Sequence, residues 1–148
     1  MKIRSLVLED DNFLRNSIME LLKERGHETY GFPDPSLCPV YLKRNCPCKL
    51  EYACADIMIT DIQMPNITGL EFIKNQTKRL CKIPNKGMMS GRWTESQEEK
   101  ATKLKCKIFK KPFDTDEFIE WIQKCEKQIN PGRKLLSWSK IKKIIYSS

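Results

Sequence analysis

Asp56-Ile57-Met58-Ile59-Thr60-Asp61-Ile62-Gln63-Met64-Pro65 is the stretch that decides the fold of this chain. Its apolar run, residues 57–59, is typical of a strand buried on both faces, and the strand ends at the carboxylate of Asp61. Because a buried strand has no favourable place for a charge, Asp61 is expected where the sheet meets water. In an open α/β sheet, ligands bind at that edge, beyond the carboxyl ends of the strands.

A second apolar run ends in the same way. Residues 3–8 are predicted to form a strand, and Glu9-Asp10-Asp11 follows it directly. Since parallel strands end at one edge of a sheet, Glu9, Asp10 and Asp61 are expected to form one acidic pocket. Carboxylates about 5 Å apart repel by roughly 3 kcal/mol per pair at an effective dielectric of about 20, so the pocket requires a cation. An all-oxygen ligand set with positions left for water favours Mg²⁺, or Mn²⁺.

Strands and helices alternate along the rest of the chain. Helical spacing of apolar residues, with caps and breakers at the ends, predicts helices over 11–25, 36–44, 69–80, 94–105 and 114–128. Further strands are predicted over 27–31, 83–89 and 107–110, although 83–89 contains poor strand formers. This alternation implies right-handed βαβ crossovers. The predicted fold class is therefore α/β, a three-layer, doubly wound sheet of five parallel strands.

The composition limits the class of protein. Its 148 residues, 40% of them hydrophobic, are enough for one domain with a core. No apolar run reaches the roughly 18–20 residues that a membrane-spanning helix needs. Residues 1–4 lead directly into a strand without a signal peptide, so we expect a cytoplasmic protein. The net charge of +8 is interpreted as a solvated basic surface, and direct nucleic-acid binding is not expected.

Two further side chains at strand ends complete the predicted pocket. Lys111 follows the last strand and supplies a fixed positive charge, and Ser90 follows the fourth strand and supplies a hydroxyl. A metal ion and a lysine together can neutralise the equatorial oxygens of a phosphoryl group in transfer, and an aspartate can act as the nucleophile. Asp61, as the lone acid at its strand end, is the best candidate for that nucleophile. The pocket therefore favours phosphoryl transfer to a carboxylate.

The order and spacing of these pieces resemble the receiver domain of two-component response regulators, at a size close to the stand-alone chemotaxis type. The resemblance covers about residues 3–127. It is carried by five motifs in register, namely Leu6-Val7-Leu8-Glu9-Asp10-Asp11, Asp56-Ile57-Met58-Ile59-Thr60-Asp61, Met64-Pro65 with Gly69, Met89-Ser90-Gly91 and Lys111-Pro112-Phe113. It implies a flavodoxin-like sheet with strand order 2-1-3-4-5. The chain then divides into a receiver domain (1–129), with a cysteine-rich insertion at about 45–54, and a basic amphipathic tail (130–148).

The resemblance also assigns the metal site and the acceptor. It implies that Asp61 is the phosphoacceptor, so the chain would be a phosphoprotein. Asp10, Asp61 and the backbone carbonyl of Gln63 would bind Mg²⁺ directly, and Glu9 would act mainly through water. No cofactor other than the metal ion is implied.

A conformational switch is the second feature that the resemblance implies. Lys111 would hold the phosphoryl group, with a cis bond to Pro112, and Ser90 would turn its hydroxyl toward that group. Receivers often carry an aromatic residue three positions before the lysine, where it moves inward when the hydroxyl turns. Ile108 stands at that position here, so the usual aromatic half of the switch is not available. The signal would be read on the face built from the fourth helix, the fifth strand and the fifth helix.

The implied function is signalling by protein contact. A sensor histidine kinase or a phosphotransfer protein would present phosphohistidine to Asp61, and the phosphorylated domain would contact a downstream protein. Phosphorylation and dephosphorylation of Asp61 would be its only catalysis. Two alternatives stay open, a pseudo-receiver scaffold that is never phosphorylated and a Mg²⁺-dependent aspartyl phosphatase. Gln63 counts against the phosphatase, because such enzymes typically carry a second aspartate two residues after the first.

The cysteines, the single histidine and the tail give less specific signals. The chain has seven cysteines, and an odd count does not suggest a disulfide framework. Four of them, Cys38, Cys46, Cys48 and Cys54, lack the paired C-x₂-C spacing of a zinc site. Free thiols are therefore preferred to a metal or redox site. The remaining cysteines, Cys81, Cys106 and Cys125, are predicted to be buried. His27 is predicted to lie on the surface.

A helix is predicted in the tail over 134–146. Leu135, Trp138, Ile141 and Ile145 would share one face of it, with lysines around them. Three interpretations stay open: the tail packs on the domain, it contacts a partner or a second copy in a homodimer, or it binds a membrane or nucleic acid.

Overall fold

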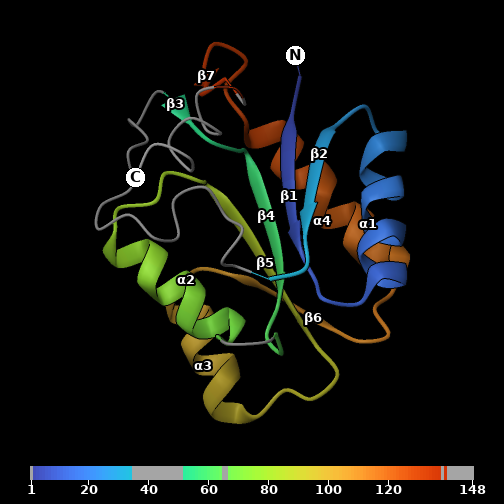
Figure 1. Ribbon diagram of the computed structural model, residues 1–148, viewed down its shortest axis with the longest axis vertical. Coiled ribbons are helices and arrows are strands. Elements are labelled where there is room, and N and C mark those ends of the chain that lie inside the picture. Colours follow the sequence, from blue (N-terminus) through green and yellow to red (C-terminus); the bar gives the residue numbers. More distant parts are fainter. Residues whose placement is uncertain (1, 35–51, 65–66, 138, 140–148) are drawn as a thin grey trace.

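A computed structural model of the chain describes residues 2–34, 52–64, 67–137 and 139 (Figure 1). Its main sheet contains five parallel strands, β1 (Arg4–Leu8), β2 (Glu28–Phe32), β4 (Ile57–Asp61), β5 (Asn85–Ser90) and β6 (Lys107–Lys110). They are paired in the order β2-β1-β4-β5-β6. Counted among these five strands, the order is 2-1-3-4-5, so the predicted fold class and topology are confirmed.

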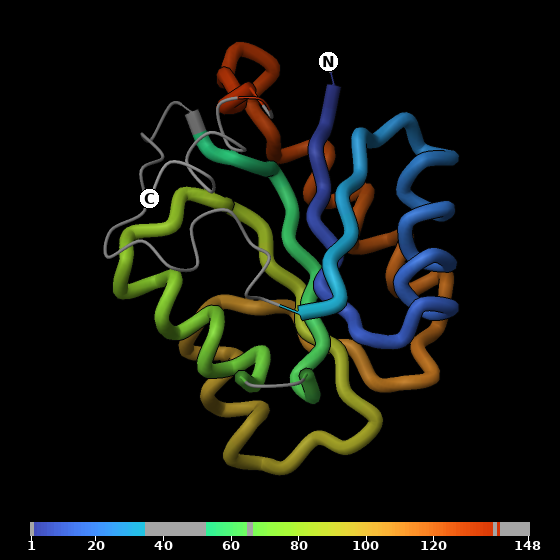
Figure 2. Tube along the Cα trace, viewed as in Figure 1, coloured from blue at the N-terminus to red at the C-terminus, as the bar shows by residue number. Residues whose placement is uncertain are grey.

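Four described helices cover the two faces of the sheet. They are α1 (Asn12–Glu24), α2 (Gly69–Lys78), α3 (Glu95–Lys103) and α4 (Thr115–Gln128). The tube trace shows α1 and α4 on one side of the sheet and α2 and α3 on the other (Figure 2). The helix predicted over 36–44 lies outside the described residues. Among the helices that the structure describes, none has the length and apolar character needed to cross a membrane.

Each face of the sheet has its own hydrophobic core. Successive side chains of a strand point to opposite faces, and the two cores divide the strand residues accordingly. Leu6, Leu8 and Met58 pack with α2 and α3, whereas Val7 and Ile59 pack with α1 and α4. Strands β1 and β4 are buried along their whole length, as expected for a sheet covered by helices on both sides.

Strand β5 forms despite its poor strand propensity. It lies between β4 and β6 and pairs with both, so burial and ladder hydrogen bonds outweigh the intrinsic preference of its sequence. Gly87 is one of the poor strand formers in this segment, and the structure explains its presence. A Cβ at this position would lie 3.0 Å from the Trp121 ring and 3.1 Å from the Phe109 ring, so the glycine makes room for that aromatic pair.

The amino ends of the strands carry a second, small sheet that the sequence did not predict. Here β3 (Tyr52–Ala53) pairs in parallel with β7 (Lys134–Leu135), and the backbone N–H of Leu136 donates to the carbonyl of Ala53. The cysteine-rich insertion expected at about 45–54 therefore contributes a short strand at its end, and the helix predicted over 134–146 is wrong at its start. Backbone pairing holds the beginning of the tail on the domain, whereas Trp138, Ile141 and Ile145 lie outside the described residues.

Two predictions about single residues are also corrected. His27 is 4% exposed rather than on the surface, because its ring bridges Ser5 and Glu126. Cys81 is only half-buried. The other two cysteines of that group, Cys106 and Cys125, are buried as predicted, and burial raises their thiol pKa values to about 11 and about 12. Cys54 is a buried free thiol, and the other three cysteines of its cluster lie outside the described residues.

Candidate functional site

The acidic residues predicted to form a pocket meet at the carboxyl edge of the sheet. Strands β1 and β4 are neighbours, with Leu8 opposite Thr60, so the residues that follow them emerge side by side. One carboxylate oxygen from each of Glu9, Asp10 and Asp61 lies within 4.8 Å of the others. Glu9 is fully buried and Asp61 is 4% exposed, whereas Asp10 faces solvent. The site is thus a buried pair of acids with an open side at Asp10.

Lys111 is the cation of this cluster. Its ammonium group donates to Glu9 Oε1 and to Asp61 Oδ2, both at 2.6 Å. Burial alone would lower the pKa of Lys111, but the hydrogen bonds and charges of Asp61 and Glu9 outweigh it and raise that pKa above its ordinary value. The backbone places the lysine by pairing its N–H with the carbonyl of Ser90, and the bond from Lys111 to Pro112 is cis.

One lysine does not balance the charge of three carboxylates. Burial, above all, and the hydrogen bond and repulsion from Asp61 raise the pKa of Glu9 to about 8, although Lys111 acts in the opposite direction. The second oxygen of Glu9, Oε2, is buried and has no hydrogen-bond partner among the described residues. A set of carboxylate oxygens that is short of positive charge, with one buried acceptor unpaired and one side open to water, fits a hard divalent cation such as Mg²⁺.

The loop after β4 orients the carboxylate of Asp61. The backbone N–H of Gln63 donates to Asp61 Oδ1 at 3.0 Å, while Lys111 holds the other oxygen. Gly69, the motif glycine, begins α2 directly against the strand end. A Cβ on Gly69 would lie 2.2 Å from the backbone oxygen of Asp61, and the Gly69 N–H donates to the carbonyl of Ile62. Only glycine permits this approach, so the motif has a steric reason, and α2 is packed closely against Asp61.

Ser90 lies at the end of β5, next to the pocket, and is 1% exposed. Its hydroxyl donates to the carbonyl of Arg92 at 2.8 Å and accepts from the Arg92 N–H at 3.1 Å. The structure therefore brings Ser90 to the same sheet edge as Asp61 and Lys111, with its hydroxyl bonded to the loop that leads into α3.

Trp93 is a residue of this region that sequence reasoning missed. Its indole Nε1–H donates to the carbonyl of Phe109 in β6 at 2.8 Å, and its ring packs against the same core cluster as Ile108. Ile108 itself is half-buried and lies opposite Met88 in the register. A tryptophan three positions after Ser90 was the available signal. It binds an aromatic side chain to the backbone of Phe109, the residue after the strand position where the aromatic residue of the resemblance is missing.

Comparison with known proteins agrees with this geometry. The profile of the response regulator receiver domain matches residues 6–123. An uncharacterized response regulatory protein of Vibrio parahaemolyticus is 36% identical over 72 residues, and the match covers 48% of this chain but only 27% of that protein. The chain thus corresponds to about a quarter of that relative's length.

Solved structures share the fold. The chemotaxis protein CheY4 of Vibrio cholerae superimposes with a TM-score of 0.67 at 19% identity, covering 84% of this chain and 99% of CheY4. The receiver domain of the Francisella response regulator 1452 gives a TM-score of 0.69 at 20% identity, covering 85% of this chain and 98% of that domain. At these identities the likeness concerns the fold alone.

Proposed function

Because this chain belongs to the response regulator receiver domain family, we propose that Asp61 accepts a phosphoryl group from a phosphohistidine donor. The donor would be a sensor histidine kinase or a phosphotransfer protein, and the phosphorylated domain would act on a downstream protein by contact. The observation that carries the proposal is the buried carboxylate of Asp61, which Lys111 and the Gln63 N–H hold by one oxygen each within an acidic cluster.

The chemistry follows from this arrangement. An oxygen of Asp61 attacks phosphorus in line, the O–P bond of an acyl phosphate forms, and the P–N bond to the donor imidazole breaks with its electron pair left on nitrogen. Lys111 is already charged and within reach, so it can move from the carboxylates to the phosphoryl oxygens without a proton transfer. Hydrolysis by water would later return the free carboxylate.

Four groups would hold the metal ion. Asp10, Asp61 and the carbonyl of Gln63 would bind it directly, and Glu9 would act mainly through water. When bound, a divalent ion supplies positive charge to the oxygens of the group in transfer. The unpaired Oε2 of Glu9 and the solvent-facing position of Asp10 support this assignment.

Ser90 and Trp93 would carry the signal out of the pocket. A serine hydroxyl has one proton, so Ser90 can donate to a phosphoryl oxygen only by giving up the carbonyl of Arg92. That loss frees the turn before Trp93, whose indole is bonded to the backbone of Phe109. We therefore assign to Trp93 the role that a strand aromatic plays in the usual switch. Two states would differ in whether Ser90 bonds to its own loop or to the phosphoryl group.

Incubation with acetyl phosphate and Mg²⁺, followed by intact mass measurement, tests the proposal. We expect the protein to gain the mass of one phosphoryl group and the Asp61→Asn variant to gain none. A protein that is never labelled would be a pseudo-receiver scaffold. A protein that consumes acetyl phosphate without lasting label would be a phosphatase, and either outcome overturns the proposal.

A further inference from the structure

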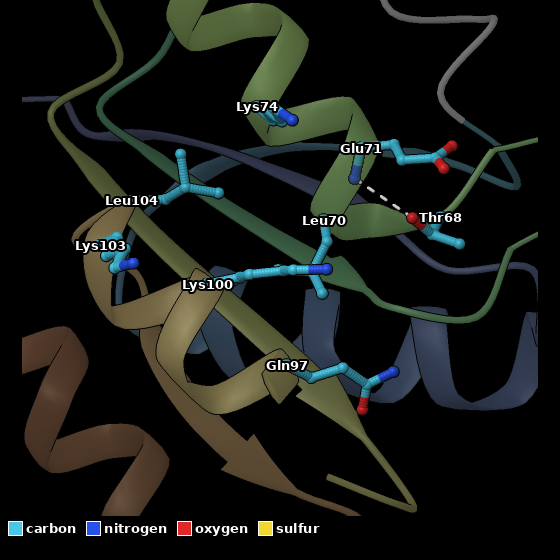
Figure 3. Close-up of a pocket in the computed structure, with 8 residues that line it drawn as sticks. All are labelled: Thr68, Leu70, Glu71, Lys74, Gln97, Lys100, Lys103 and Leu104. Carbon is cyan, nitrogen blue, oxygen red and sulfur yellow. Dashed lines mark hydrogen bonds between the residues drawn. The ribbon is translucent and has the colours of Figure 1, made fainter. Parts of the chain in front are cut away.

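A groove with a volume of about 450 Å³ lies between α2 and α3, on the face away from α1 and α4 (Figure 3). Leu70 and Leu104 line it, and both are half-buried extensions of the hydrophobic core below. Lys74 from α2 and Lys100 and Lys103 from α3 line it as well, and all three are exposed. The groove therefore combines an apolar floor with a basic rim.

The charges on this rim are not neutralised within the domain. Lys74, Lys100 and Lys103 form no hydrogen bond or ion pair in the part of the chain that the structure describes. The lining contains a single acid, Glu71, against these three lysines. An apolar floor with an excess of unpaired lysines matches a ligand that offers both leucine-like side chains and carboxylates.

Both walls of the groove begin at the phosphoacceptor site. The α2 wall starts at Gly69, which packs directly against the backbone of Asp61. The α3 wall starts at Thr94, which caps the helix immediately after Trp93 and the Arg92 backbone bonded to Ser90. A change in the Ser90 hydrogen bond would therefore act on the α3 wall, whereas the α2 wall is packed against the strand end, so the width of the groove would depend on that bond.

We propose that the groove between α2 and α3 is a docking site for an acidic amphipathic segment of a partner protein, and that phosphorylation of Asp61 changes its affinity. The second half of this inference rests on the proposed function, whereas the first half does not. The site lies on the other side of α3 from the surface formed with β6 and α4, which the resemblance implies for signalling.

Other occupants fit less well. The chain's own residues 130–148 contain five lysines and arginines and no acid, and residues 35–51 contain Lys43, Arg44 and Lys49 with one acid. Both segments carry the same sign of charge as the rim. Nucleic acid is disfavoured because the neighbouring surface of α3 presents Glu95, Glu98 and Glu99. Their negative charges would repel a phosphate backbone that extends beyond the groove.

The probe for the test is a short, fluorescently labelled helical peptide of leucine and glutamate, with leucines at i, i+3, i+4 and i+7. Fluorescence polarisation gives its dissociation constant. We expect binding to the wild-type protein and a dissociation constant raised roughly tenfold by Lys74→Glu with Lys103→Glu. The matched control, Lys124→Glu with Lys127→Glu, reverses two exposed lysines of α4 and should leave binding unchanged. Urea unfolding confirms that both double variants are folded.

The same titration after treatment with acetyl phosphate and Mg²⁺ tests the coupling. We expect the affinity to change at least about threefold, roughly 0.7 kcal/mol, in the wild-type protein and not in Asp61→Asn. The docking site is overturned if the two double variants bind the peptide equally, if neither the phosphorylated nor the unphosphorylated protein binds it, or if the protein prefers an oligonucleotide to the peptide. Lysine-dependent binding by a protein that takes up no phosphoryl group supports the docking site and overturns the proposed function instead.

Discussion

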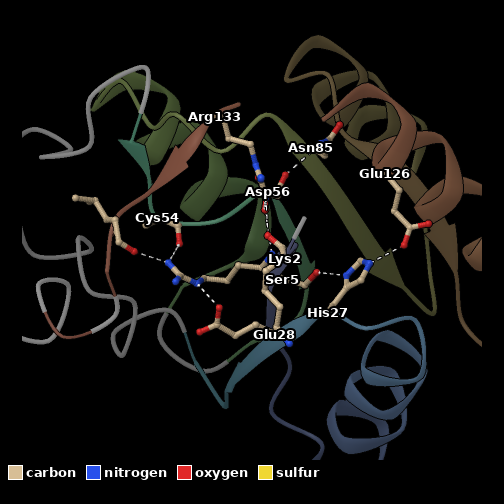
Figure 4. A network of polar contacts seen from close by, with 11 residues as sticks. Lys2, Ser5, His27, Glu28, Cys54, Asp56, Asn85, Glu126 and Arg133 are labelled. Carbon is tan, nitrogen blue, oxygen red and sulfur yellow. Dashed lines mark hydrogen bonds and ion pairs between the residues drawn. The ribbon is translucent and has the colours of Figure 1, made fainter. Parts of the chain in front are cut away.

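The two edges of the central sheet both hold buried charges, but they balance them differently. At the amino edge, Arg133 donates to both oxygens of Asp56 at 2.8 and 2.6 Å, and the backbone N–H of Arg4 donates to the same carboxylate (Figure 4). Nearby, the ring of His27 bridges Ser5 and Glu126. At the carboxyl edge, Lys111 pairs with Glu9 and Asp61, two of the three clustered acids, and a buried oxygen of Glu9 has no hydrogen-bond partner among the described residues.

This difference is the one expected between a structural network and a candidate site for chemistry. Asp56 and Asp61 flank the same strand, and both are almost fully buried, so burial alone does not distinguish them. Asp56 has its counter-ion and hydrogen bonds within the domain, which is what a buried charge needs in order to be tolerated. Among the described residues, Asp61 belongs to a cluster of three carboxylates that shares one lysine, which is the arrangement expected at a functional position.

The most direct test of this comparison is to substitute the cation at each edge, Lys111 and Arg133. Lys111 and Arg133 each lie 2.6 Å from an aspartate, with 23% and 18% of the side chain exposed. We expect Lys111→Met to slow phosphorylation by acetyl phosphate about a hundredfold, because the charge that stabilises the group in transfer is lost. Arg133→Met should leave the initial rate within about twofold of wild type. Intact mass measured over time gives both rates.

A Lys111→Met variant that is phosphorylated as fast as the wild type would contradict the assigned role of the lysine. A large loss of rate in a folded Arg133→Met protein would show that the amino edge takes part in the chemistry. Asp56→Asn, just before the strand that ends at the proposed acceptor Asp61, serves as a further control and should still be phosphorylated.

The carboxyl edge could be predicted from sequence because each of its residues follows a strand. Parallel strands end at one edge, so Glu9, Asp61, Ser90 and Lys111 had to meet once the strands were recognised. The order of the strands was a different matter, since it came from resemblance to a family and not from the hydrophobic pattern.

The amino edge could not be predicted, because its contacts join positions far apart in the chain. Arg133 reaches Asp56 across 77 positions, and His27 reaches Glu126 across 99. No local pattern signals such a pair. In a tail rich in basic residues, nothing in the sequence distinguished Arg133, which binds Asp56, from its neighbours. The Trp93 contact was missed for a similar reason, since a loop residue reaches a strand backbone that only the fold brings near.

The second prediction is that substitution at the amino edge, which should leave the phosphorylation rate almost unchanged, lowers the stability of the fold. Arg133→Met leaves the carboxylate of Asp56 buried; among the described residues its side chain then keeps the Arg4 N–H as a donor and has no counter-ion. We expect the free energy of unfolding to fall by about 3 kcal/mol, as is typical when one partner of a buried pair is removed. Urea denaturation monitored by circular dichroism measures it. Lys124→Met, at an exposed position on α4, is the control and should change stability by less than about 0.5 kcal/mol.

Restoring the balance should restore the stability. The double variant Arg133→Met with Asp56→Asn removes both charges, so it is expected to be more stable than Arg133→Met alone. If the double variant were the less stable of the two, the uncompensated carboxylate would not be the cause of the loss.

The third prediction is that Mg²⁺, which would supply positive charge at the carboxyl edge, stabilises the fold. At free Mg²⁺ one hundred times its dissociation constant, the free energy of unfolding should rise by about 2.7 kcal/mol relative to protein in EDTA. Arg133→Met should show the same gain, because the amino edge does not take part. The double variant Asp10→Asn with Asp61→Asn should show almost none. A gain that survives in this double variant would place the ion elsewhere.

The smallest effect is expected at the amino edge, in the pH dependence of Glu126. Burial alone would raise the pKa of Glu126, but hydrogen bonds from Arg25 and His27 and their charges more than offset it and hold that pKa below 4.5. A carboxyl group whose pKa is lower in the folded state than in the unfolded state stabilises the fold above the unfolded value. That contribution is lost as the pH falls through the folded value.

Glu126→Gln should therefore cost about 1 kcal/mol at neutral pH, because a charged acceptor for two donors is replaced by a neutral one. The difference from wild type should shrink as the pH falls from 4.5 toward the folded pKa, since the wild-type carboxylate itself becomes neutral. Glu120→Gln, an exposed glutamate on the same helix, should show no such pH dependence. Urea unfolding across this range measures all three proteins. A wild-type advantage that stayed constant down to the most acidic pH would mean that Glu126 stabilises the amino edge by packing, and the contrast between a charge-balanced edge and a charge-deficient edge would then lose one of its two ion-pair networks.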